Sequence, residues 1–256
     1  MPNLLQETKF IMKKYNITAN KSLGQNFLVS EEAVESIVNS ANITKEDLII
    51  EIGPGLGTLT QRLLEKAGKV ICIELDTRMV NIITERFSLY NNIEIINQDV
   101  LKVNLQELIK NEKENNNLKK AKVVANLPYY ITTPIIMKLL ESNLGLESIT
   151  VMVQKEVAER LIAKPGDSLS GAITYTVYYY AIGTKIIDVP NNSFIPKPEV
   201  TSQVIKLTLR KEPITYIENK EKFFEIIKLA FMQRRKTLVN SLANSKIATK
   251  QKIEQI

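Results

Sequence analysis

The sequence contains no histidine and only one cysteine. Any catalysis must therefore proceed without an imidazole as acid or base. A single cysteine excludes an intrachain disulfide and a Cys/His zinc site, and we expect no metal site. That cysteine, Cys72, lies in the apolar run "KVICIELD", which favours a buried small side chain over a catalytic thiol.

Long apolar runs are also missing. Stretches such as "LII" and "VICI" are far shorter than the roughly 18 residues that span a bilayer, and the N-terminus lacks the apolar block of a secretory signal. We therefore expect a cytoplasmic protein without a membrane partner. With 256 residues, 44% apolar and 24% charged, the chain is large enough for one main core and a smaller appended unit, and we expect a monomer.

Positive charge is concentrated at the two ends of the chain. Residues 1–30 hold four Lys/Arg against one Glu, and residues 206–256 hold twelve against five. Because the formal net charge is +6, the middle of the chain carries −4. A basic patch is typical of a protein that binds a phosphate-rich partner, and scattered lysines that only confer solubility are the alternative.

Short β-branched runs alternate with helical patterns, which indicates an α/β fold with a parallel sheet wrapped by helices. Two further runs, at 184–190 and 201–209, are joined by the proline-rich segment "NNSFIPKPEV" and predict an antiparallel hairpin at the sheet edge. The runs predicted as parallel strands are 47–53, 69–75, 93–99, 122–128 and 148–154.

Three units are expected along the chain. Residues 1–20 form a basic N-terminal extension, 21–212 the α/β domain, and 213–256 a small helical domain that is rich in basic residues. The polar stretch at 111–120, "NEKENNNLKK", is predicted to be a surface loop.

A glycine-rich turn, "EIGPGLGTLT", follows the first predicted strand and opens a helix. Gly53, Gly55 and Gly57 thus lie at the carboxyl end of that strand, where doubly wound sheets bind ligands. A dinucleotide-binding fingerprint needs its third glycine at position 58, which is Thr58, so a pyrophosphate ligand is disfavoured. A purely structural role of the glycines is the alternative.

Acidic residues follow the same set of strands. Glu74 ends the second strand and can accept hydrogen bonds from ribose hydroxyls, while Asp99 ends the third and can accept from an adenine amino group. Glu51, just before the glycines, can balance the ammonium of a bound amino acid. Each acid could be a solvated strand-end residue, but as a set they match S-adenosylmethionine, which has an adenosine, an ammonium and no phosphate.

The segment "NLPYYITTP" follows the fourth strand, beside the predicted cofactor cleft. The side-chain oxygen of Asn126 and the carbonyl of Leu127 can accept the two hydrogens of an adenine amino group and so turn its lone pair towards a methyl donor. Pro128 stiffens this loop, and Tyr129 offers a ring face for the base. A plain strand-ending turn is the alternative, because Asn and Pro are common turn formers.

Six ordered motifs resemble the ribosomal RNA adenine N6,N6-dimethyltransferases, and more narrowly their bacterial small-subunit branch. The resemblance covers about residues 8–242. It implies a Rossmann-like, seven-stranded methyltransferase domain with a small helical C-terminal domain. The motifs are "KSLGQNFL", "EIGPGLGTLT", "NLPYYITTPI", "MVQKEVAERLIAKPG", "FIPKPEVTS" and "AFMQRRKTLVNSL".

The resemblance implies further site residues. Asn26 and Leu28 would contact S-adenosylmethionine together with the glycines, the acids and Asn126. Phe194, which we expect to be exposed on its proline-rich loop, would stack on a flipped adenine opposite Tyr129, and packing in the core is the alternative. The implied substrate is a pair of adjacent adenosines in the 3′-terminal hairpin loop of small-subunit (16S) ribosomal RNA, methylated within an assembling subunit.

Basic residues are expected to dock the RNA backbone. Arg234, Arg235 and Lys236 follow a helical pattern in the C-terminal unit, and Lys21 lies in the basic N-terminal part. Three alternative functions remain: methylation of large-subunit (23S) RNA as in the macrolide-resistance relatives, methylation of adenine in DNA, and a non-catalytic RNA-binding role in assembly.

Overall fold

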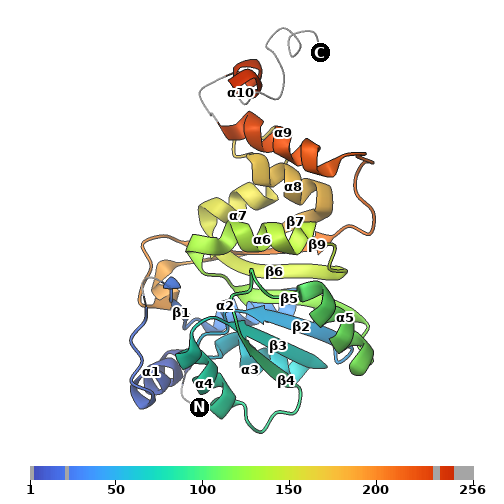
Figure 1. Ribbon diagram of the computed structural model, residues 1–256. Helices are drawn as coiled ribbons and strands as arrows, with labels where there is room; N and C mark the ends of the chain where they lie inside the picture. Colours follow the sequence, from blue (N-terminus) through green and yellow to red (C-terminus); the bar gives the residue numbers. More distant parts are fainter. Residues whose placement is uncertain (1–2, 21–22, 233–236, 245–256) are drawn as a thin grey trace.

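The structure is a computed structural model that describes residues 3–20, 23–232 and 237–244. It is built on a seven-stranded sheet with the strand order β4-β3-β2-β5-β6-β9-β7 (Figure 1). The strands of this sheet are β2 (Asp47–Ile52), β3 (Lys69–Glu74), β4 (Ile93–Asn97), β5 (Lys120–Asn126), β6 (Leu146–Gln154), β7 (Ala181–Val189) and β9 (Ser202–Leu209).

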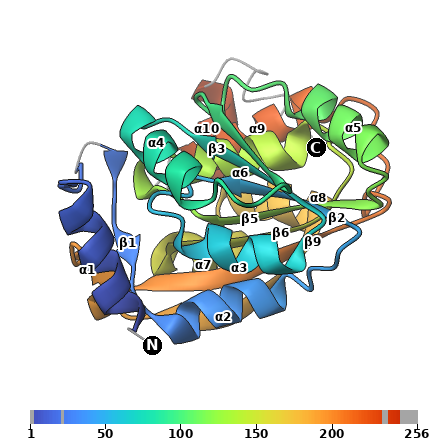
Figure 2. The ribbon, with the colours of Figure 1, turned by 90° about the horizontal axis from the view of Figure 1, so that it is seen from below.

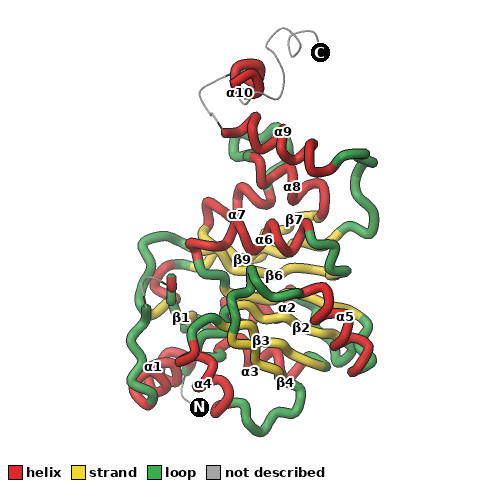
Figure 3. Tube along the Cα trace, in the orientation of Figure 1, coloured by secondary structure: helices red, strands yellow, loops and turns green. Residues whose placement is uncertain are grey.

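Helices lie on both faces of this sheet (Figures 2 and 3). Buried residues of α2 and α3 pack on one face, and those of α5, α6 and α7 pack on the other. The helices are α1 (Leu4–Lys14), α2 (Glu31–Ser40), α3 (Thr58–Lys66), α4 (Thr77–Arg86), α5 (Leu105–Asn115), α6 (Thr132–Glu141), α7 (Lys155–Ile162), α8 (Ala172–Tyr180), α9 (Lys220–Met232) and α10 (Leu238–Asn244).

The strands β4, β3, β2, β5 and β6 are parallel, because each is followed by a helix that returns the chain to the starting edge. The inner strands β3, β2, β5 and β6 are almost entirely buried, as their continuous apolar runs predict, whereas the edge strand β4 is only partly buried. The expected hairpin is confirmed: β7 pairs antiparallel with β9, and β9 lies between β6 and the edge strand β7. The α/β, Rossmann-like arrangement is therefore confirmed.

The prediction of a surface loop over 111–120 is wrong. Helix α5 continues to Asn115 and β5 already begins at Lys120. The helix begins where the side chain of Asn104 accepts a hydrogen bond from the backbone of Glu107, and it buries Ile109 against the sheet. Its lysines and glutamates are good helix formers, so the polar composition reflects an exposed helix face and not an absence of structure.

The ends of the chain pack onto this body. Helix α1 buries Ile11 against Phe27 and Leu56 in a small separate core. After β9, helix α9 lies against α8, where the rings of Tyr179 and Phe224 have their centroids 5.4 Å apart. Within residues 3–20, 23–232 and 237–244, no helix is long and apolar enough to cross a membrane.

Candidate active site

A cleft of about 1030 Å³, including its open mouth, lies at the carboxyl ends of β2, β3, β4 and β5. This is the position that a parallel α/β sheet offers to ligands, because the loops leaving neighbouring strands converge there. The structure thus brings the glycine turn, the acidic residues and the "NLPYY" loop together. The predicted residues that line the cleft are Asn26, Leu28, Glu51, Gly53, Gly55, Glu74, Asp99, Asn126, Leu127, Pro128 and Tyr129.

The glycine turn holds its backbone in a conformation that other residues rarely adopt. The φ angles of Gly53 and Gly55 are +67° and +57°, and both residues line the cleft. Gly57 has φ +85° and begins α3 outside the lining. A Cβ atom at Gly57 would lie 2.5 Å from the ring of Phe87, so this glycine is required by packing.

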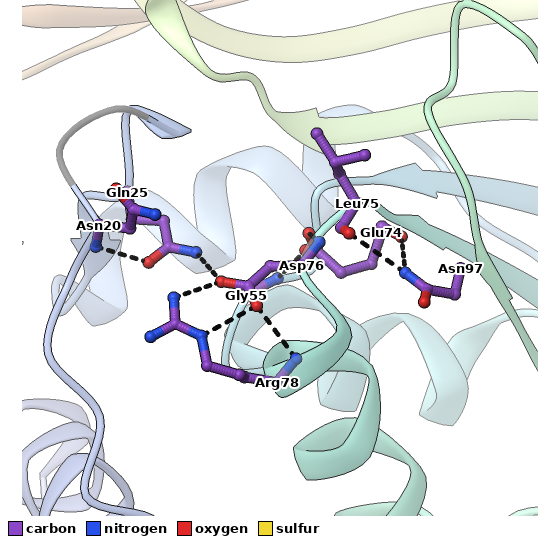
Figure 4. A network of polar contacts seen from close by, with 8 residues as sticks. All are labelled: Asn20, Gln25, Gly55, Glu74, Leu75, Asp76, Arg78 and Asn97. Atoms are coloured by element: carbon purple, nitrogen blue, oxygen red, sulfur yellow. Dashed lines mark hydrogen bonds and ion pairs between the residues drawn. The ribbon is translucent and has the colours of Figure 1, made fainter.

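Glu74, at the end of β3, accepts hydrogen bonds from two backbone N–H groups (Figure 4). Its Oε2 accepts from the backbone N–H of Gly55 at 3.2 Å, and its Oε1 accepts from that of Asp76 at 2.8 Å. Burial raises the pKa of this carboxyl despite these donors. A carboxylate has lone pairs for about four hydrogen bonds, so Glu74 can still accept from two hydroxyl groups.

Glu51 on β2 is buried beneath α3. Its Oε2 accepts from the hydroxyl of Thr60 at 2.7 Å, and the thiol of Cys72 lies 3.5 Å away. Burial raises the pKa of Glu51 to about 7. An ammonium group placed near this carboxylate would favour its charged form. Cys72 is fully buried, so its predicted role as an apolar core residue is confirmed.

The acidic lining of the cleft distinguishes between adenosine ligands with and without phosphate groups. Asp99 lies in the loop after β4, and its Oδ1 accepts from the backbone N–H of Leu101 at 2.9 Å. Three carboxylates line the cleft, and none of its described lining residues is a lysine or an arginine. Carboxyl groups without a basic residue among the described lining disfavour a pyrophosphate, whereas an uncharged adenosine joined to an ammonium would fit. The residues present therefore fit S-adenosylmethionine.

Asn126 ends β5 at the inner wall of the cleft. Its side-chain N–H donates to the backbone carbonyl of Asn26 at 3.4 Å, which orients the amide. Within the described part of the chain, no group donates to the Oδ1 of Asn126. Leu127 is held by a hydrogen bond from its N–H to the carbonyl of Met152 at 3.1 Å. The amide oxygen of Asn126 is thus an oriented acceptor that has no donor among the described residues.

Pro128 and Tyr129 complete this loop. The carbonyl of Pro128 accepts from the hydroxyl of Thr132 at 3.0 Å, which ties the loop to the start of α6. The phenol oxygen of Tyr129 lies 2.6 Å from the hydroxyl oxygen of Ser202. Burial raises the pKa of Tyr129, so the phenol is neutral. It forms a hydrogen bond with Ser202 in which either hydroxyl can donate.

The expected exposure of Phe194 is wrong, because its side chain is only 3% exposed. Phe194 lies in the short strand β8 (Phe194–Ile195), which pairs antiparallel with β1 (Phe27–Leu28). In this register Leu28 is opposite Phe194, and both side chains belong to the core between the sheet and α2. The N-terminal segment therefore covers the ring that the proline-rich loop alone would expose.

Figure 4 shows a polar network that fixes the N-terminal segment over the cleft. The side-chain N–H of Gln25 donates to the Oδ2 of Asp76 at 2.9 Å, and the Oε1 of Gln25 accepts from the backbone N–H of Asn20 at 2.8 Å. Arg78 donates to the same carboxylate at 2.6 Å. Sequence reasoning did not single out Gln25 or Asp76, because their contact joins segments far apart in the chain.

Ser202 and Thr60 were also missed. The only sequence signal for Ser202 is its place in the "FIPKPEVTS" motif, and that signal does not reveal its partner. The predicted RNA contacts Lys21, Arg234, Arg235 and Lys236 lie outside the described residues.

The family described as "Ribosomal RNA adenine dimethylase" matches residues 16–256. The chain is 48% identical over 238 residues to the "Ribosomal RNA small subunit methyltransferase A" of Bacillus pumilus, a match that covers 93% of this chain and 81% of the relative. The protein of that name from Clostridium botulinum is 48% identical over 241 residues, with 94% and 85% covered.

Solved structures are similar as well. A dimethyladenosine transferase from Plasmodium falciparum superposes with a TM-score of 0.72 at 30% identity, covering 86% of this chain and 76% of the other. The 23S rRNA methyltransferase ErmE gives a TM-score of 0.69 at 25% identity, with 90% and 88% covered. The resemblance carried by the six motifs is confirmed, and the chain belongs to the ribosomal RNA adenine dimethylase family of enzymes.

Proposed function

We propose that this protein transfers methyl groups from S-adenosylmethionine to the N6 atoms of two adjacent adenosines in the 3′-terminal hairpin loop of small-subunit (16S) ribosomal RNA, twice on each. The observation that carries the proposal is the meeting of two features in one cleft. Carboxylates without basic neighbours suit the methyl donor, and the free acceptor of Asn126 suits the adenine amino group. The choice of small-subunit RNA rests on the name shared by relatives at 48% identity.

In the cofactor part of the cleft, each acid has a separate partner. Glu74 would accept from the ribose hydroxyls, Asp99 from the adenine amino group, and Glu51 would balance the ammonium. The backbone of Gly53 and Gly55 leaves room for close approach because no Cβ projects from it. Asn26 and Leu28 would close the cleft from the N-terminal segment. When bound, S-adenosylmethionine supplies a methyl group made electrophilic by its sulfonium.

In the acceptor part, Asn126 and the carbonyl of Leu127 would hold the two amino hydrogens of the target adenine. This turns the nitrogen lone pair out of conjugation with the ring and towards the methyl group. The nitrogen loses one proton for each methyl group gained, and water at the open mouth can take it, so no histidine is needed. Positioning of this kind can contribute roughly 7 to 11 kcal/mol to lowering a barrier.

Two rings support this arrangement in different ways. Tyr129 would stack on the target base, an interaction worth about 1 to 3 kcal/mol. Phe194 is buried, so in this proposal it supports Leu28 of the cleft wall and does not stack on the base.

The proposed partner is a small ribosomal subunit at an assembly stage that leaves the hairpin accessible. The protein would bind it as a monomer in the cytoplasm. Its RNA backbone would be bound by Arg234, Arg235, Lys236 and Lys21. Neutralised phosphates release counterions, so this docking should weaken as salt concentration rises.

The test is to incubate the protein with labelled S-adenosylmethionine and either small subunits lacking the modification or naked large-subunit RNA, and to map the labelled base. The expected result is dimethylation of two adjacent adenosines in the small-subunit hairpin. Label in large-subunit RNA alone would assign the other activity, and no label with either substrate would favour a non-catalytic assembly role.

A further inference from the structure

We infer that the outer face of helix α1, formed by Lys9, Phe10 and Lys13, is a docking surface for a single-stranded segment of the substrate RNA. The inference deepens the proposed function and rests on it. It concerns a surface that lies beside the cleft and takes no part in holding the cofactor.

Phe10 is exposed in a helix that already has a buried face. Helix α1 buries Leu4, Thr8 and Ile11, whereas the side chain of Phe10 is 66% exposed. One apolar face is sufficient to pack an amphipathic helix, so the mostly exposed ring of Phe10 is not needed to pack α1. An aromatic ring held on a rigid helix in this way is suited to stacking on an unpaired base.

Two lysines flank this ring without an acidic partner. Lys9 and Lys13 lie four residues apart and Phe10 lies three before Lys13, so the three side chains share one side of the helix. Like charges at this spacing destabilise a helix, and no acid of the described chain pairs with either lysine. Lys14 differs, because its ammonium lies 2.8 Å from the carboxylate of Glu85.

The helix is fixed firmly at the edge of the cleft. The side chains of Asn3 and Gln6 form a capping box at its start, and Glu7 pairs with Arg86 of α4 at 2.7 Å. Its buried Ile11 packs in the same small core as Phe27 and Leu56, both of which line the cleft. Figures 1 and 2 show α1 beside β1, and both residues of β1 line the cleft, so α1 lies next to the wall that the N-terminal segment gives to the cleft.

The chemistry of this face favours RNA over other occupants. Two free ammonium groups beside one aromatic ring match a strand that presents phosphates and an unstacked base. A second copy of this chain would bring the same two positive charges to the contact and repel them.

The test compares three variants: Phe10→Ala, the double change Lys9→Gln/Lys13→Gln, and a control, Lys110→Gln/Lys113→Gln. The control makes the same change of charge on α5, which lies across the molecule from α1 (Figure 1). The dissociation constant of a fluorescent single-stranded oligoribonucleotide with the 3′-terminal small-subunit sequence is measured over a salt titration.

Phe10→Ala should weaken binding by about 5- to 150-fold, the range for loss of one stacked base. The double lysine change should flatten the slope of the logarithm of the association constant against the logarithm of the salt concentration by about 1.4. Each lost phosphate contact on a single strand contributes about 0.7 to this slope. The control should change neither, and all three variants should keep the wild-type melting temperature and affinity for S-adenosylmethionine.

An unchanged dissociation constant in the α1 variants would overturn the inference, as would an equal loss in the α5 control. A fall in sedimentation-determined mass caused by Phe10→Ala alone, with RNA affinity unchanged, would instead assign this face to a contact between copies of the chain. Because oligonucleotide binding is measured without methyl transfer, failure of the proposed enzymatic function would be seen separately in the labelling assay.

Discussion

The phenol oxygen of Tyr129 lies 2.6 Å from the hydroxyl oxygen of Ser202, and this contact joins the proposed catalytic loop to the antiparallel part of the sheet. Ser202 is fully buried at the start of β9, where its backbone is paired with both Gln154 of β6 and Val189 of β7. Because both neighbouring strands fix the backbone of Ser202, its hydroxyl stays in one place. Ser202 therefore holds the Tyr129 ring in one orientation.

Changing Ser202 to Ala should lower the rate of methylation by about 5- to 13-fold, which corresponds to the loss of one hydrogen bond of about 1 to 1.5 kcal/mol. The affinity for S-adenosylmethionine should stay at the wild-type value, because Ser202 does not line the cleft. Single-turnover rates on unmodified small subunits measure the effect. Tyr129→Phe should produce a similar loss, and the double variant should be no slower than either single one. Additive losses would show that the two groups act independently.

The variant Asn126→Ala should lose methylation by on the order of 10²-fold or more, because an oriented acceptor of the target amino group is removed. Cofactor binding, measured by calorimetry, should change little. Asn126→Asp is a useful companion, since it keeps an acceptor oxygen but removes the N–H that donates to Asn26. Near-normal dimethylation by the alanine variant would disprove the role assigned to Asn126.

Because Phe194 is buried, the variant Phe194→Ala should lose stability. Removal of a buried phenylalanine side chain typically costs about 3 to 5 kcal/mol. Urea denaturation should therefore show a clear fall in the free energy of unfolding. The matched control is Tyr130→Ala, because the Tyr130 ring is 53% exposed and should contribute little. Equal stability of the two variants would mean that Phe194 is not packed in the core in solution.

The titration of Glu51 should make stability depend on pH. Its pKa is about 7 in the folded protein against an ordinary value of 4.5, so between these pH values the folded protein retains a proton that the unfolded chain has released. The stabilising contribution is fully present below pH 4.5 and is lost as the pH rises to about 7. The loss is on the order of 3 kcal/mol.

The variant Glu51→Gln has no proton to release at this site. Its free energy of unfolding should therefore lack this fall between pH 4.5 and 7, when both proteins are denatured with urea at a series of pH values. Parallel curves for the wild type and the variant would place the pKa of Glu51 near its ordinary value in the folded protein.

The positions of the strands, and the meeting of most predicted site residues in one cleft, could be predicted from the sequence. The segments predicted as strands are short, apolar and rich in β-branched residues. In a parallel sheet the residues that follow such strands meet at one edge of the sheet. For this reason Gly53, Glu74 and Asn126 could be placed in one cleft without any knowledge of their contacts. The three acids of the predicted set, Glu51, Glu74 and Asp99, also pointed to a ligand without phosphates.

Only the tertiary structure decided which side chains are covered and which polar groups meet. Phe194 is buried because β1, from the other end of the chain, pairs with β8, and Ser202 finds Tyr129 because β9 inserts between β6 and β7. Local pattern predicts the conformation of a segment, whereas burial and hydrogen bonding depend on what packs against that segment. These partners are distant in the sequence, so their contacts exist only once the whole sheet has formed.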